Sequence, residues 1–140
     1  MTEKMTEKMN TCRLVRPDTS FVGKQAFTYF TGISADNVGA EAICMHLLTI
    51  PPAGRAKAHL HEHHETTIYV IAGEAGMYFG DRLAEHMDCR AGDFIYIPAG
   101  VPHLPYNASA TEPCTAVVAR TDPNEQESVV LRPDLDELAP

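Results

Sequence analysis

Residues 92–107 read Gly-Asp-Phe-Ile-Tyr-Ile-Pro-Ala-Gly-Val-Pro-His-Leu-Pro-Tyr-Asn. The run Phe94–Ile97 contains only β-branched and aromatic residues, which predicts a strand. Pro98 and Gly100 follow at once, and a Pro-x-Gly break of this kind predicts a turn that ends the strand. Because that turn reverses the chain, we expect His103 to point back into the fold.

The chain on either side repeats this pattern of short apolar runs and turn residues. Runs about 8–12 residues apart, broken by Gly or Pro, are typical of an all-β sandwich or barrel. Only residues 41–50 fit a helix or a strand equally well, and we favour a strand because Pro51-Pro52 stops the run. The expected organisation is a disordered leader at 1–12, one domain at 13–132 and an acidic tail at 133–140.

Composition and charge exclude several classes of protein. The 140 residues are 44% apolar, enough for a buried core, and the net charge of −8 argues against a nucleic-acid surface or a polybasic membrane anchor. No apolar run approaches the roughly 18 residues that span a bilayer. The four cysteines form no C-x-x-C pair and the polar start resembles no secretory signal, so we expect a cytoplasmic protein.

Four of the seven histidines lie within one short segment, at positions 59, 61, 63 and 64. On a strand, His59 and His61 share a face because side chains alternate with period two. A lone His-x-His pair is more often a solvated loop than a metal site. His103 offers a third imidazole, however, and imidazole suits divalent transition metals. We therefore predict one divalent metal ion, which could be Fe, Zn, Ni or Mn.

Together the two segments resemble the cupin superfamily. The second cupin motif is Gly, five residues, Pro, one residue, Gly, two residues, His, three residues, Asn. Its first motif is Gly, five residues, His-x-His, three or four residues, Glu, six residues, Gly, which residues 54–73 approximate. The resemblance implies an all-β fold, the cupin-type double-stranded β-helix (a jelly-roll barrel). The positions that match the motifs as structural residues are Gly54, Gly73, Gly92, Pro98, Gly100 and Asn107.

The resemblance leaves the family's glutamate ligand in two registers. Glu65 follows the His-x-His pair at an allowed distance, but seven residues separate it from Gly73, where the family has six. Counting back from Gly73 places Thr66 there instead, which gives a site of three histidines. We favour Glu65 as a ligand, because bulges are common beside active sites and a carboxylate would halve the charge of a buried ion. His63 or His64 could also supply a fourth imidazole.

Other residues are weaker candidates for the site. His46 could line the cavity, although a hydrogen-bonded core histidine is the more ordinary interpretation. Aromatic residues could wall a pocket, although such residues are more often barrel core. The aromatic candidates are Tyr69, Tyr78, Phe94 and Tyr96.

Catalytic metal sites keep a coordination position open, so this donor set favours an enzyme acting on a small molecule. The first hypothesis is a non-haem Fe(II) dioxygenase whose substrate is enolisable or a hydroxylated aromatic. The alternatives are a Zn, Ni or Mn Lewis-acid isomerase, cyclase or lyase, and a non-catalytic module that binds a metal and a small ligand. The cupin resemblance also implies a homodimer.

Overall fold

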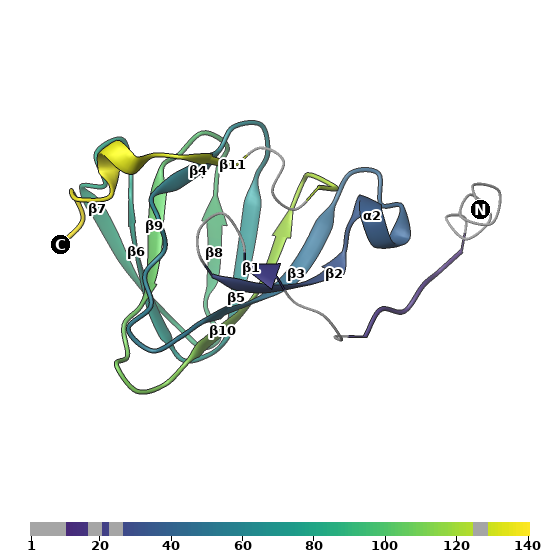
Figure 1. Ribbon diagram of the computed structural model, residues 1–140, viewed down its shortest axis with the longest axis horizontal. Coiled ribbons are helices and arrows are strands. Elements are labelled where there is room, and N and C mark those ends of the chain that lie inside the picture. Colours follow the sequence, from purple (N-terminus) through teal and green to yellow (C-terminus); the bar gives the residue numbers. More distant parts are fainter. Residues whose placement is uncertain (1–10, 17–20, 23–26, 125–128) are drawn as a thin grey trace.

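The computed structural model describes residues 11–16, 21–22, 27–124 and 129–140. Most of the expected leader therefore lies outside the described residues. Two antiparallel sheets face each other and enclose the core (Figure 1). This arrangement confirms the predicted all-β jelly roll. None of the helices among the described residues has the length and apolar character needed to cross a membrane.

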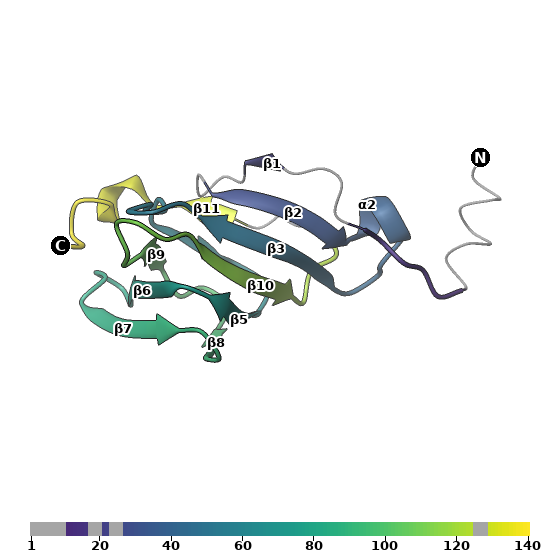
Figure 2. The ribbon, with the colours of Figure 1, turned by 90° about the horizontal axis from the view of Figure 1, so that it is seen from below.

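The larger sheet has six strands, and the strand predicted within residues 41–50 forms β3 at one of the two central positions of this sheet. Figure 2 shows β3 (Cys44–Ile50) between its two neighbours in this sheet. In spatial order its strands are β1 (Phe21–Val22), β2 (Thr28–Ile33), β3 (Cys44–Ile50), β10 (Cys114–Arg120), β5 (Thr66–Ala72) and β8 (Phe94–Ile97).

The smaller sheet has five strands and carries the histidines of both motifs. Among the described residues, two short helical turns complete the fold, α2 (Ala35–Val38) and the 3-10 turn η1 (Pro133–Leu135). In spatial order the five strands are β11 (Val129–Leu131), β4 (His59–His61), β9 (His103–Asn107), β6 (Glu74–Phe79) and β7 (Glu85–Arg90).

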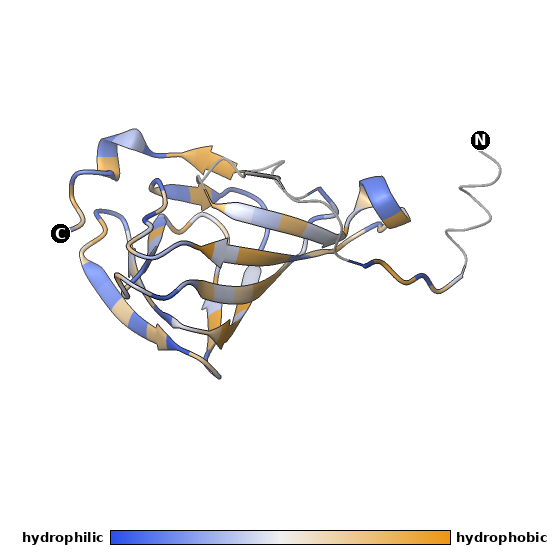
Figure 3. Cartoon of the chain, turned by 60° about the horizontal axis from the view of Figure 1, so that its bottom comes forward, coloured by the Kyte–Doolittle hydropathy of each residue, from blue (hydrophilic) through white to orange (hydrophobic). Residues whose placement is uncertain are grey.

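The core lies between the inner faces of the two sheets. Along β10, burial alternates strictly, and Cys114, Ala116 and Val118 point inward. The strands carry hydrophobic and hydrophilic bands in alternation (Figure 3), as expected where one face is buried. Arg120 occupies the last inward position of this strand and is only 4% exposed. The alternation of side chains along β10 therefore places a guanidinium group in the interior.

The carboxyl-terminal segment packs against the outer side of the smaller sheet. Leu135 and Ala139 are buried in an apolar cluster that includes Leu104 of β9. Arg55 donates hydrogen bonds to the carbonyl oxygens of Asp136, Ala139 and Pro140. The acidic segment predicted at residues 133–140 is therefore packed against the domain and hydrogen-bonded to it.

Candidate metal site

Three histidines from two neighbouring strands meet inside the barrel. β4 supplies His59 and His61, and β9 begins with His103, which pairs directly with His59. Their ligand atoms all lie within 4.8 Å of one another, and each residue is 2% exposed. Two donors at a tetrahedral angle on one ion lie about 3.4 Å apart when each metal–nitrogen bond is about 2.1 Å. With a small closing movement, the cluster can hold one divalent metal ion.

Two of the three rings are held in one tautomer by the backbone. The His59 Nδ1–H donates to the carbonyl oxygen of Lys57 at 2.7 Å. The His103 Nδ1–H donates to the carbonyl oxygen of Val101 at 2.9 Å. Because a carbonyl only accepts, Nδ1 carries the proton in each neutral ring. The Nε2 lone pair of both rings is thereby left to bind a metal.

The third ring, that of His61, has nitrogen atoms available for a metal ion. Both ring nitrogens of His61 are buried, and neither has a hydrogen-bond partner among the described residues. A buried polar group without a partner costs about 1–3 kcal/mol. A metal ion at the centre of the cluster would satisfy one of these nitrogens.

Burial keeps the cluster in the neutral form that binds metals. Loss of hydration is the largest cause that lowers the pKa of His59 and His61 far below 6.5, and it brings the pKa of His103 to about 4. The buried guanidinium of Arg120 lowers all three pKa values further. Since metals bind only deprotonated imidazole, the site is prepared for a ligand at neutral pH.

We expect the metal-free protein to lose stability as the pH falls below 6.5. Burial lowers the pKa of His103 to about 4 and that of His46 to about 3, from the ordinary histidine pKa of 6.5. At a pH between each lowered pKa and 6.5, the histidine is protonated in the unfolded chain and neutral in the folded chain, so acid favours unfolding. Each such histidine removes about 1.4 kcal/mol per pH unit. Urea unfolding at several pH values measures this slope, and a constant free energy of unfolding from pH 7 to 5 would contradict it.

The structure does not bring Glu65 to the histidines, contrary to the ligand set favoured from the sequence. The Glu65 side chain is exposed, and its carboxylate accepts a hydrogen bond of 2.6 Å from the hydroxyl of Tyr96. Thr66 is 2% exposed and lies inside. β5 does carry a one-residue irregularity, but it lies at Ile71, where the pairing with β10 passes from Val70 to Ala72. From Thr66 to Tyr69 the pairing of β5 with β8 is unbroken. The register with three histidines is therefore the one that the fold adopts.

Replacing Glu65 with glutamine should leave metal affinity within about twofold of the wild type, because an exposed side chain away from the cluster changes stability by less than about 0.5 kcal/mol. The hydrogen bond from Tyr96 to Glu65 raises the pKa of that tyrosine, so the pKa should move back toward 10 in the variant. Metal titration checks the first outcome, and a tenfold loss of affinity would restore Glu65 as a ligand.

The remaining histidine candidates are outside the group whose ligand atoms all lie within 4.8 Å of one another, although the ring of His64 lies close to that of His61. His63 is exposed. His64 is buried, with Nδ1 3.0 Å from a carboxylate oxygen of Asp122, and its ring centre lies 5.0 Å from that of His61. Nε2 of His46 lies 3.3 Å from Nη1 of Arg120. Sequence reasoning missed Arg120 and Asp122, although the inward alternation of β10 offered a signal for the arginine.

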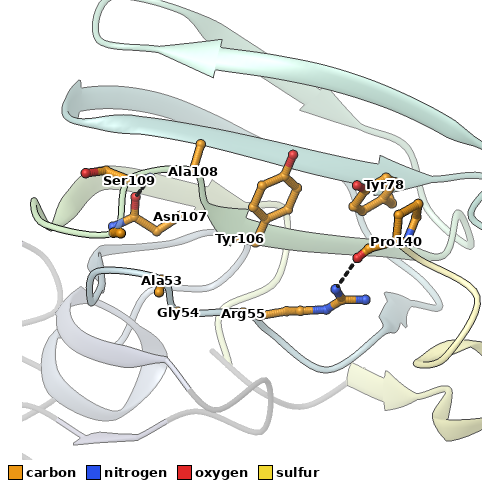
Figure 4. A pocket seen from close by; sticks show the side chains of 10 residues that line it. Ala53, Gly54, Arg55, Tyr78, Tyr106, Asn107, Ala108, Ser109 and Pro140 are labelled. Atoms are coloured by element: carbon orange, nitrogen blue, oxygen red, sulfur yellow. Dashed lines mark hydrogen bonds between the residues drawn. The ribbon is translucent and has the colours of Figure 1, made fainter.

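The four aromatic candidates do not form one pocket. Tyr69 and Phe94 lie on the outer face with ring centres 4.7 Å apart, and Phe94 is 82% exposed. Tyr78 lines an outer cavity of about 290 Å³ with Tyr106 (Figure 4). Tyr96 borders a different cavity, together with Met77 of β6 and Met87 of β7. The aromatic wall expected around the metal is therefore not formed by this set.

The turn after β8 is tied to the metal strand. The backbone N–H of Gly100 donates to the carbonyl oxygen of His61 at 2.8 Å. The Asn107 amide donates to the carbonyl oxygens of Ile50, Pro51 and Glu112. The first contact holds the strand that carries His61, and the second holds the end of β9, which carries His103. Gly100 and Asn107 therefore help to fix the backbone that positions the histidines.

Comparison with known proteins supports the resemblance to cupins. The family model described as Cupin domain matches residues 46–120. The comparison with curated proteins found no match. Oxalate decarboxylase from Bacillus subtilis at pH 4.6 aligns with a TM-score of 0.64 and 21% identity, over 84% of this chain and 29% of that chain. A structure from work on the Mn(II) centres of Bacillus subtilis oxalate decarboxylase aligns with a TM-score of 0.65 and 21% identity, over 84% and 30%.

This chain thus spans less than a third of the length of those structures. At this level of identity the likeness shows the fold alone, because one fold hosts many activities.

Proposed function

The chain belongs to the cupin superfamily, and from that premise we propose that it is a metal-dependent enzyme that acts on a small molecule at the three histidines. The buried, unpaired imidazole of His61 carries the proposal. A structural metal site is usually closed by four protein ligands, whereas three leave room for water or substrate. The donor set therefore supports catalysis more than a purely structural ion.

The residues around the site prepare it for an acidic substrate hydroxyl. Three neutral imidazoles leave the charge of a divalent ion undiminished, and Glu65 is turned away. A bound ion would supply O₂ chemistry if it is Fe(II), or Lewis acidity if it is Zn, Ni or Mn. The carbonyls of Lys57 and Val101 hold the two rings in place. This positive site favours an enol or phenol that loses its proton on binding, so we place a dioxygenase first.

A Lewis-acid lyase is the second candidate. It is favoured by one observation, namely that a similar solved structure is an oxalate decarboxylase with Mn(II) centres.

The experiment is anaerobic loading of the protein with Fe(II), Mn(II) or Zn(II), followed by addition of pentane-2,4-dione or catechol. A dioxygenase consumes O₂ with Fe(II), and the His103→Ala variant does not. Product formed with Mn(II) or Zn(II) without O₂ uptake would identify the Lewis-acid enzyme. A protein that converts neither compound with any metal would be a binding module instead.

We also propose that two copies of this chain associate through the outer face of the larger sheet. Uncharged residues form a row in register across five strands of this face. The chain has a net charge of −8, so two copies repel each other where acidic surfaces meet. Contact through the uncharged face keeps those acidic surfaces apart. Sedimentation should show a dimer that the Tyr69→Lys variant weakens, and a monomeric wild type would contradict it. The residues of the row are Phe30, Leu47, Val117, Tyr69 and Phe94.

A further inference from the structure

A cavity of about 360 Å³ lies between β6, β7 and β8. Most of its wall is apolar, with two thioethers and two aromatic rings among the lining side chains. Thioethers adapt to irregular ligands, and apolar walls with few polar groups are typical of small-molecule sites. The apolar side chains that carry the argument are Met77, Phe79, Met87, Ile97 and Val101.

The cavity borders the metal site through the strand register. Phe79 of β6 pairs directly with His103 of β9, and paired residues on adjacent strands place their side chains next to each other. Val101, also in the lining, provides the carbonyl that accepts the proton of the His103 ring. Ile97 pairs with Thr66, which is buried on the inner side. A molecule in this cavity would therefore touch two neighbours of His103, Phe79 and Val101, while none of the three histidines is itself in the lining.

The charged residues that line the cavity are both acidic. They are Asp81 and Glu85, and no Lys, Arg or His is among the described residues of the lining. Arg132 lies within electrostatic range of Asp81, but its guanidinium makes two hydrogen bonds to the carboxylate of Asp134. Two carboxylates beside an apolar wall repel an anion and accept a neutral or cationic molecule.

We propose that this cavity binds the apolar or aromatic part of an uncharged or cationic small molecule and discriminates against carboxylates, including dianions such as oxalate. That the bound molecule is the substrate rests on the proposed function above. The binding does not, because it requires only the cavity walls.

The test uses metal-free protein labelled with ¹³C at the methionine methyl groups, assigned with the Met77→Leu and Met87→Leu variants. Three probes share one ring and differ in charge: benzyl alcohol, benzylammonium and benzoate. Benzyl alcohol and benzylammonium should shift both methyl signals, and benzoate should bind about tenfold more weakly, since two nearby like charges in partly screened surroundings oppose it by about 1–2 kcal/mol. Equal affinity for the three probes would overturn the discrimination, and no shift with any probe would overturn the cavity.

A charge-matched pair of variants isolates the two carboxylates. The double variant Asp81→Asn/Glu85→Gln should bind benzoate about fivefold to tenfold more tightly than the wild type. The control Asp88→Asn/Glu74→Gln removes the same charge from exposed positions on β7 and β6 outside the cavity, and it should leave benzoate binding unchanged. An equal gain in both double variants would reduce the effect to net charge and overturn the assignment.

The outcomes separate this inference from the proposed function. Methyl shifts without turnover of any compound would leave the cavity assignment intact and remove the enzyme. Turnover without methyl shifts would leave the enzyme and remove this cavity as its binding site.

Discussion

The His61→Ala variant is expected to bind a divalent metal at least a hundredfold more weakly than the wild type. Loss of a residue that merely supports a ligand costs about 10–100-fold in affinity, and loss of one of three donors costs more. His61 faces the cluster with both ring nitrogens buried and without hydrogen-bond partners among the described residues. The alanine removes a donor that no neighbouring side chain replaces without moving, since Nδ1 of His64 already meets Asp122.

His63→Ala is the matched control, because His63 lies two residues away but is exposed. It should retain the full metal content when both variants are loaded, desalted and measured by elemental analysis. A stoichiometric ion in the His61→Ala variant, or equal loss in both variants, would contradict the site.

The Gly73→Ala variant is expected to lose about 2–6 kcal/mol of stability. Gly73 connects β5 to β6 with φ +94°, and a Cβ there would lie 2.6 Å from the carbonyl oxygen of Pro113 and 2.8 Å from the Cα of Cys114. Both neighbours are backbone atoms and cannot rotate away. The backbone strain costs about 1–3 kcal/mol and the forced contact adds about 1–3 kcal/mol.

Gly92→Ala separates these two causes. Gly92 has φ +95°, but nothing lies within 4 Å of the position that a Cβ would take. This variant should lose only the part that comes from backbone strain. Urea unfolding of both variants measures the difference, and equal losses would show that the contact at Gly73 is relieved by movement of the adjacent strand.

Much of the fold follows from local features of the sequence. Phe94–Ile97 forms the strand that its β-branched and aromatic residues predict, and β9 begins at His103 after the Pro-x-Gly turn. The ambiguous run of residues 41–50 forms a strand as well, with inward and outward residues in alternation. Strand propensity, turn residues and period-two alternation all act within a few residues, so one sequence is enough to read them.

The choice between Glu65 and Thr66 could not be read in the same way. Both positions are allowed by the motif spacing, and the face that each takes depends on how β5 pairs with distant strands. In the structure Thr66 pairs with Ile97 on one side and with Arg120 on the other. A pairing between residues so far apart in the chain fixes the register, and a shift of one residue would have reversed every side chain.

The prediction of an aromatic wall around the metal was wrong for a related reason. Phe94 and Tyr96 alternate with Ile95 and Ile97, so both faces of β8 are apolar in sequence. Alternation shows which residues share a face but not which face is inside when both are apolar. Tyr96 lines the cavity together with residues of β6 and β7, including Met77, whereas Phe94 does not.

The central claim is that one divalent ion is held by the imidazoles of His59, His61 and His103. X-ray absorption of the zinc-loaded protein tests it directly, because imidazole ligands give a distinctive pattern of scattering beyond the first coordination shell. The account predicts one zinc per chain with three imidazole nitrogens at about 2.0–2.1 Å and no sulfur ligand. A site with one imidazole or none, or with scattering from a thiolate, would contradict it.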